Sequence, residues 1–123
     1  MKRKTKKRAM AAIGRYLELK GYKILEEGWS HGGDTAGYIV TDGYGLAFVF
    51  GDAARNAGEG IPDRAADRKA FERLAAAYLT EHPEHADCPV RADVVALLVL
   101  SDNRAILRHH VNAIDACGLD LLP

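Results

Sequence analysis

The sequence predicts an α/β domain in which helices flank a mixed central β-sheet. Two features lead to this fold class. The runs Gly45–Phe50 and Val94–Leu100 are almost entirely apolar, as strands buried on both faces of a sheet are. Helix-like and strand-like segments also mix along the chain, in the order helix, three strands, helix, two strands, which favours a sheet with helices packed on its faces. At 123 residues the chain has room for one hydrophobic core.

The first helix is predicted over residues 6–20. Met10, Ile13 and Leu17 recur at helical spacing and form one apolar face. Gly21 follows at the position where a residue with positive φ commonly ends a helix.

Three strands are predicted next, over Tyr22–Trp29, Gly37–Thr41 and Gly45–Phe50. The turn between the second and the third falls at Asp42 and Gly43. These two residue types tolerate the positive φ angles that a tight hairpin requires, so the two strands are expected to be antiparallel neighbours.

The second half of the chain predicts the longest helix, over Asp63–Glu81, and two more strands. Asp63 follows Pro62 and is the expected start of this helix. After a polar loop, Val90–Leu100 is predicted as a central strand and Ala105–Val111 as an edge strand. The positions of the helix expected to be buried are Ala66, Ala70, Leu74, Ala77 and Tyr78.

Charge divides the chain into a basic, flexible arm over residues 1–8 and a single domain over residues 9–123. The whole chain has 17 basic and 17 acidic side chains, and removing the six basic ones of the arm leaves 11 against 17 in the domain. Basic side chains that contact phosphates release counterions, which makes the arm a candidate nucleic-acid contact. The alternative is a solvated terminus, and the acidic domain limits any binding to a weak one. The basic residues of the arm are Lys2, Arg3, Lys4, Lys6, Lys7 and Arg8.

The sequence indicates neither a membrane protein nor a secreted one. No apolar run approaches the roughly 18 residues of a membrane-spanning helix, so no membrane partner is expected. The basic N-terminus leads into no apolar signal segment. Cys88 and Cys117 lack the close spacing of a metal or redox motif, and we expect two reduced thiols in a cytoplasmic protein.

Several segments, in order and at matching spacing over roughly residues 8–114, resemble the YraN-like proteins. This is a bacterial family of predicted endonucleases with a restriction-endonuclease-like fold. The matching segments are Arg15-Tyr16-Leu17-Glu18, Gly21-Tyr22-Lys23-Ile24-Leu25, Asp42-Gly43, Leu46-Ala47-Phe48-Val49, Gly60-Ile61-Pro62, Lys69, Tyr78-Leu79, Val90-Arg91-Ala92-Asp93-Val94-Val95, His109 and Asn112-Ala113-Ile114.

The resemblance implies an active centre of the PD-(D/E)xK type. Carboxylates in such a centre hold Mg²⁺, which activates water and polarises the scissile phosphate, while a lysine stabilises the developing charge. Matched to the family, Met10 replaces the glutamate of the first helix and Gly37 the aspartate of the second strand. Phe50 and Asp52 replace the glutamate and lysine of the third strand, and Asp52 is expected to face the same pocket as the other matched positions. With one carboxylate and no lysine, this set predicts no catalytic residues, no cofactor and no hydrolysis.

The expected function is therefore that of a catalytically degenerate nuclease-fold protein. It would retain weak binding of DNA or RNA through the basic arm and the former active-site cleft. Lys69, which matches a lysine of the family, is a further candidate contact. One alternative is an active Mg²⁺-dependent endonuclease with relocated groups, in which Asp34 and Asp52 supply the metal ligands. Each of these acids also has an ordinary interpretation, as a solvated side chain or one paired with a nearby arginine. A second alternative is a protein-interaction domain, for example a homodimer.

Two other groups of residues allow more than one interpretation. His82, His85 and Cys88 are spaced three apart and suit Zn²⁺, but no second cluster completes a tetrahedral site, and a polar surface loop is the simpler interpretation.

Arg91 and Asp93 share one face of the predicted fourth strand and are expected to form an ion pair rather than a catalytic group. His109 and His110 face opposite sides of their strand, so they cannot both enter one site. His109 is expected to make a structural hydrogen bond.

Overall fold

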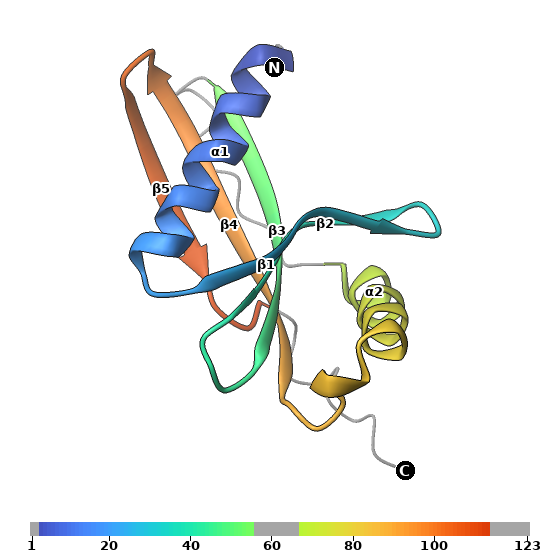
Figure 1. Cartoon of the computed structure of the whole chain (residues 1–123). Coiled ribbons are helices and arrows are strands. Elements are labelled where there is room, and N and C mark those ends of the chain that lie inside the picture. Colours follow the sequence, from blue (N-terminus) through green and yellow to red (C-terminus); the bar gives the residue numbers. More distant parts are fainter. Residues whose placement is uncertain (1–2, 56–66, 114–123) are drawn as a thin grey trace.

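The computed structural model describes residues 3–55 and 67–113, and it confirms the predicted α/β class and order of elements. Its five strands form one mixed sheet in the order β1-β2-β3-β4-β5, with β3 and β4 parallel and the other neighbours antiparallel (Figure 1). This arrangement is consistent with a restriction-endonuclease-like fold. The elements are α1 (Arg3–Leu19), β1 (Lys23–His31), β2 (Asp34–Thr41), β3 (Leu46–Arg55), α2 (Arg68–Glu81), the 3₁₀ helix η2 (Pro83–His85), β4 (Val90–Ser101) and β5 (Arg104–His110).

α1 begins at Arg3, before the predicted start at residue 6. Residues 3–8, expected from the sequence to be a flexible arm, therefore have helical backbone. Lysine, arginine and alanine have high helix propensity, which explains why the helix extends into this basic segment. Within residues 3–55 and 67–113, neither helix is long and apolar enough to cross a membrane.

α2 begins at Arg68, so the predicted start at Asp63 is wrong. The helix is capped by Asp67, whose carboxylate accepts hydrogen bonds from the backbone N–H groups of Lys69 and Ala70, at 3.0 and 3.2 Å. These bonds satisfy two of the N–H groups that the first turn of a helix leaves without a partner. Asp63 itself lies outside the described residues. The buried residues of α2 are Ala70, Leu74, Ala75 and Tyr78.

β1 to β4 are longer than the sequence predicts, while β5 has the predicted length and begins one residue earlier. β3 continues to Arg55, five residues beyond the expected end at Phe50, because it pairs with β4 along its whole length, from Leu46–Val90 to Arg55–Val99. The hairpin turn at Asp42 is confirmed. Its carboxylate accepts hydrogen bonds from the N–H groups of Tyr44 and Gly45, and Gly43 has a φ of 90°.

Two hydrophobic clusters cover opposite faces of the sheet, because successive residues of a strand point to opposite sides. On β3, Ala47 and Val49 join the cluster beneath α1, while Leu46 and Phe48 join the cluster beneath α2. The β1–β2 hairpin projects from the sheet over α2 (Figure 1). The α1 cluster also contains Ile13, Leu17, Tyr38, Val40 and Val95; the α2 cluster also contains Ala36, Ile39, Leu74, Ala75 and Tyr78.

A glycine allows α1 to approach β2 closely. A Cβ atom on Gly14 would lie 2.6 Å from the hydroxyl oxygen of Tyr38 and 2.9 Å from its ring. The same hydroxyl donates a hydrogen bond of 2.6 Å to the carbonyl oxygen of Met10. The absent side chain at Gly14 thus sets the distance between helix and sheet at the point where Met10 lies.

Candidate functional site

Two of the four residues that the resemblance matches to an active centre come together in the structure. A Cβ atom on Gly37 would lie 2.8 Å from the methyl carbon of Met10, and one on Gly51 would lie 2.9 Å from the Met10 sulfur. β2 and β3 stop pairing just here, since their last paired residues are Tyr38 and Val49. The thioether of Met10 therefore fills the space between the two strands that the missing side chains of Gly37 and Gly51 leave open.

The other two residues of the set lie on the opposite face of the sheet. Phe50 packs against the α2 cluster, not against Met10. Asp52 is two residues farther along β3 and shares the face of Phe50, because strand residues alternate. The residue of this segment that faces Met10 is Gly51. Asp52 is thus separated by the sheet from Met10 and Gly37, contrary to the expectation of a shared pocket.

The chemistry of these side chains does not fit a magnesium centre. Mg²⁺ requires hard oxygen ligands in octahedral geometry, whereas the space beside Gly37 and Gly51 holds a thioether and contains no carboxylate from the three residues that form it. Among the described residues, no group of three or more histidine, cysteine, aspartate or glutamate side chains is arranged to hold a metal ion.

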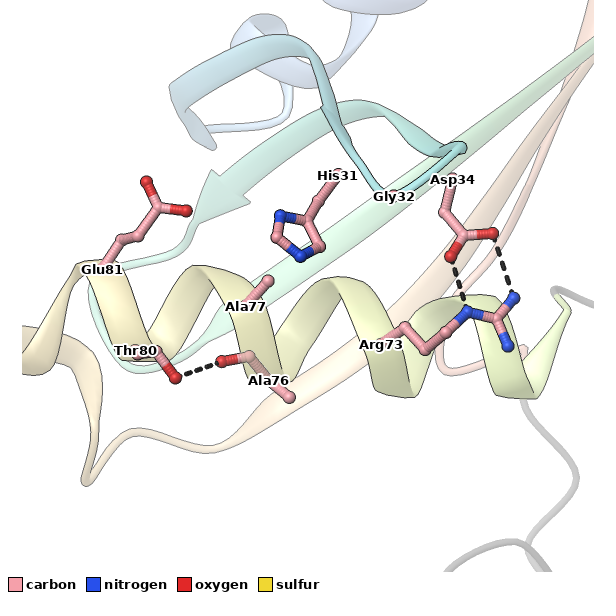
Figure 2. Close-up of a pocket in the computed structure, with 8 residues that line it drawn as sticks. All are labelled: His31, Gly32, Asp34, Arg73, Ala76, Ala77, Thr80 and Glu81. Carbon is pink, nitrogen blue, oxygen red and sulfur yellow. Dashed lines mark hydrogen bonds and ion pairs between the residues drawn. The ribbon is translucent and has the colours of Figure 1, made fainter.

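Asp34, the other acid considered for a metal site, forms an ion pair with Arg73 of α2. The Nε and Nη2 groups of Arg73 donate to the two carboxylate oxygens at 2.6 and 3.0 Å (Figure 2). This bond lowers the pKa of Asp34 below its ordinary value. The two-pronged geometry occupies both oxygens, so Asp34 joins the hairpin to α2.

This ion pair stands at one end of a groove with a volume of about 680 Å³. Figure 2 shows His31, Gly32 and Asp34 on the hairpin facing a side of α2 that carries two alanines. The only other hydrogen bond drawn there runs from the Thr80 hydroxyl to the Ala76 carbonyl. The groove offers apolar contact and an imidazole, but no pair of groups positioned for catalysis. Its lining consists of His31, Gly32, Asp34, Arg73, Ala76, Ala77, Thr80 and Glu81.

A fully buried carboxylate, Asp93 of β4, lies on the α1 side of the sheet. It accepts hydrogen bonds from Arg91 at 2.9 and 3.3 Å, from Nε2 of His109 at 2.8 Å and from the N–H of Asn112 at 2.9 Å. Burial acts to raise the pKa of Asp93, but the bonds from His109, Arg91 and Asn112 together outweigh it, and the pKa is lowered. The predicted ion pair with Arg91 and the structural hydrogen bond of His109 are both confirmed.

The second nitrogen of His109 extends this network to α1. Its Nδ1 lies 2.8 Å from the hydroxyl of Tyr16, and Arg91 donates to the hydroxyl of Tyr22 at 2.8 Å. The sequence of groups tyrosine, histidine and aspartate resembles a proton relay. However, burial, with the nearby Tyr22 and Asp93, raises the pKa of Tyr16, which keeps its hydroxyl protonated. We interpret the network as a structural connection that joins α1 and the α1–β1 connection to β4 and β5.

A second groove, of about 180 Å³, lies between the N-terminal part of α1, the end of β3 and the β4–β5 turn. Three arginines from these three places line it: Arg8, Arg55 and Arg104. We call this the arginine groove. It includes one candidate residue of the predicted basic arm, Arg8, whose helix also carries the exposed Lys6 and Lys7. Lys69 is exposed on α2, and its helix packs on the other face of the sheet.

The predicted surface loop before β4 contains η2. His82 lies 3.4 Å from Glu84, and the sulfur of Cys88 lies 3.7 Å from Nδ1 of His85. His82 and His85 also stack against Tyr78 of α2. These contacts join the loop to the helix, and the three side chains are not gathered around a common point suited to a metal ion.

No family model matches the chain, but curated relatives do. Over 103 residues the chain is 30% identical to the UPF0102 protein GSU0650 of Geobacter sulfurreducens. The matched region covers 81% of this chain and 80% of the relative. The chain belongs to the UPF0102 family. It is also similar to UPF0102 proteins of Trichlorobacter lovleyi, at 29% identity over 81% of both chains, and of Paramagnetospirillum magneticum, at 38% identity over 65% of this chain and 66% of the relative.

The UPF0102 chain has site residues that its sequence did not single out. Gly51 could have been found, because strand alternation separates it from both Phe50 and Asp52. Nothing in the sequence around Arg55 or Arg104 indicates a site. Both are distant in sequence from Arg8, and the folding of the sheet brings the three arginines to one groove. Arg73 likewise reaches Asp34 across 39 positions of the chain.

Proposed function

We propose that this UPF0102 protein is a catalytically inactive member of a nuclease lineage, related to the YraN-like predicted endonucleases, and that it binds nucleic acid weakly. The observation that carries the proposal is the position of Met10. Its thioether occupies the space between β2 and β3 at the two positions where the family resemblance expects a glutamate and an aspartate. Without oxygen ligands there, the charge stabilisation that a metal gives phosphodiester hydrolysis is lost.

The basic residues support the nucleic-acid part of the proposal. Lys6, Lys7 and Arg8 are exposed on α1, and Arg55 and Arg104 line one groove with Arg8. Most contacts between proteins and nucleic acids are to phosphates and do not read sequence. The rest of the chain has more acidic than basic side chains, so the binding should be weak and strongly dependent on salt.

The absence of hydrolysis is tested by incubating supercoiled plasmid with the protein and Mg²⁺ or Mn²⁺. We expect the plasmid to stay intact. Nicking that is sensitive to chelator and survives repurification would overturn the proposal in favour of the endonuclease alternative. In that case Asp34→Asn and Asp52→Asn, compared with Asp87→Asn as an exposed control, would show whether relocated acids are responsible.

Binding is tested by titrating fluorescent single-stranded and double-stranded DNA and RNA at two salt concentrations. We expect weak binding that becomes weaker as salt rises. Lys6→Gln with Lys7→Gln should reduce the slope of the salt dependence by about one unit for each phosphate that the protein no longer neutralises. Lys20→Gln with Lys23→Gln removes the same charge from exposed positions elsewhere and is the matched control. An absence of binding at both salt concentrations would contradict the proposal and favour a protein-interaction role, which sedimentation of the protein as a homodimer would support.

A further inference from the structure

The arginine groove combines positive charges from elements that are far apart in sequence. Arg8 comes from α1, Arg55 from the end of β3 and Arg104 from the start of β5. Apolar residues also line the groove: Ala9, Ala12, Leu97, Val99 and Ala105. The turn from β4 to β5 adds three polar residues to the lining, Ser101, Asp102 and Asn103.

Asp102 is the acidic residue of this lining, and it contacts two of the arginines in different ways. Its carboxylate lies 3.5 Å from Nη2 of Arg55. Its backbone carbonyl accepts a hydrogen bond of 3.1 Å from Nη2 of Arg8. A carbonyl is neutral, so the bond orients the Arg8 guanidinium without neutralising its charge. The groove therefore has three positive charges against one negative charge.

These groups match the chemistry of a phosphate. Guanidinium groups bind phosphate oxygens through two parallel N–H donors, and they are the usual choice where phosphates are bound. The volume of about 180 Å³ is smaller than the roughly 300–1,000 Å³ of sites that enclose a whole small molecule. A charged group on a longer molecule fits such an open groove better than an enclosed cofactor does.

We propose that the arginine groove binds a backbone phosphate of nucleic acid and that the Asp102 carboxylate competes with this phosphate for Arg55. The inference rests on the proposed function and adds to it the binding position and an internal competitor. The carboxylate lies at the edge of hydrogen-bonding distance and its side chain is 88% exposed, while that of Arg55 is 51% exposed. Ion pairs as exposed as this one are weak, so a phosphate that brings two negative oxygens can replace the carboxylate.

The two residues should have opposite effects on binding. Asp102→Asn removes the competitor and should tighten oligonucleotide binding by about two- to fivefold, in line with the strength of an exposed ion pair. Arg55→Gln removes the guanidinium that meets the phosphate, and it should weaken binding and lower the salt slope by about one unit. Arg68→Gln is the matched control. It breaks a similar exposed ion pair, with Glu72 at 4.0 Å, on α2, and should leave both quantities unchanged.

The measurement is a fluorescence titration of a short oligonucleotide at several salt concentrations, with thermal unfolding of each variant as a check on folding. If the wild-type chain binds but Asp102→Asn and Arg55→Gln bind as the wild type does, the groove inference is overturned and the proposed function stands. If the wild-type chain binds no nucleic acid, both are overturned.

A second experiment separates nucleic acid from free phosphate as the source of the anion. The amide resonances of Arg8, Arg55 and Arg104 are followed by NMR during titration with an oligonucleotide and, at matched ionic strength, with inorganic phosphate. We expect shifts with the oligonucleotide at concentrations at least tenfold lower than with phosphate. Shifts with inorganic phosphate alone would identify a free-anion site and contradict the proposal.

Discussion

The sulfur of Met10 lies 2.9 Å from the point where a Cβ atom on Gly51 would stand. The methyl carbon of Met10 is 3.0 Å from the same point. The methionine and the glycine therefore fit each other, and enlarging one requires the other to move. The packing of Met10 between β2 and β3 can therefore be tested by measuring the free energy of unfolding of variants, without an assay of activity.

Gly51→Ala should destabilise the protein by about 1–2 kcal/mol, since overpacking a filled site has a cost and the flexible Met10 side chain can relieve part of it. The double variant Met10→Ala with Gly51→Ala should lose less than the sum of the two single variants, with a coupling of about 0.5–3 kcal/mol. Urea unfolding of the four proteins measures this. Strictly additive losses would mean that the two side chains do not share the space.

Gly14→Ala tests the close approach of α1 to β2. Alanine improves helix propensity by about 1 kcal/mol, but its methyl group would meet the rigid ring of Tyr38. We expect the clash to dominate, with a net loss of about 1–3 kcal/mol in the free energy of unfolding. Ala11→Gly at an exposed position of α1 calibrates the propensity effect. A gain in stability for Gly14→Ala would show that the helix can move away from the sheet at no cost.

Asp93→Asn should destabilise the protein at neutral pH by about 3 kcal/mol, because the half-buried Arg91 and His109 lose their charged partner. The pH dependence follows from the lowered pKa of Asp93. The unfolded chain takes up a proton near the ordinary value of 3.8, whereas the folded carboxylate resists protonation until a lower pH. Its contribution is present above pH 3.8 and is lost as the pH falls through the folded-state pKa.

The gap in unfolding free energy between wild type and Asp93→Asn should therefore narrow in acid. Urea unfolding at pH 7, 5, 4 and 3 measures the gap, and Asp87→Asn, an exposed acid, is the control. A gap that stays constant over this range would contradict the linkage between the network and the charge of Asp93.

Asp67→Ala should remove the cap of α2 and cost about 1 kcal/mol, as the loss of an N-cap acceptor usually does. Asp67→Asn keeps an acceptor oxygen at the same place and should be nearly neutral. Thermal unfolding of the pair compares them directly. Equal losses for alanine and asparagine would mean that the charge of Asp67, rather than the cap, is what stabilises the helix.

Most of the fold of this chain can be predicted from local sequence patterns, because most helices, strands and turns are determined by the residues within them. The apolar run at Gly45–Phe50 requires a buried strand, and Asp42 with Gly43 requires a turn. The start of α2 is harder to predict because Asp63 and Asp67 are both acceptable caps by residue type. Only the three-dimensional course of the backbone selects Asp67, and only pairing with β4 carries β3 on to Arg55.

The candidate sites depend on relations that a single sequence does not contain. The matched positions predict one pocket for Met10, Gly37, Phe50 and Asp52, but the strands separate beside Gly37, and Phe50 faces the other side of the sheet. The sequence allows the prediction that Asp34 pairs with an arginine, but it does not identify Arg73 as that arginine. The arginine groove is not foreseeable, because no motif links residues that meet across three elements.

The bond between Tyr16 and His109 has a consequence for how the chain is made. The two residues are 93 positions apart, so after α1 has been synthesised the ribosome must still add nearly all of β1 to β5 before His109 is present. At roughly 5–20 residues per second, the nascent helix waits on the order of 5–20 s. During that interval Ile13 and Leu17 can already pack against β2 and β3, so the bond to His109 is the last connection of α1 to the sheet to form.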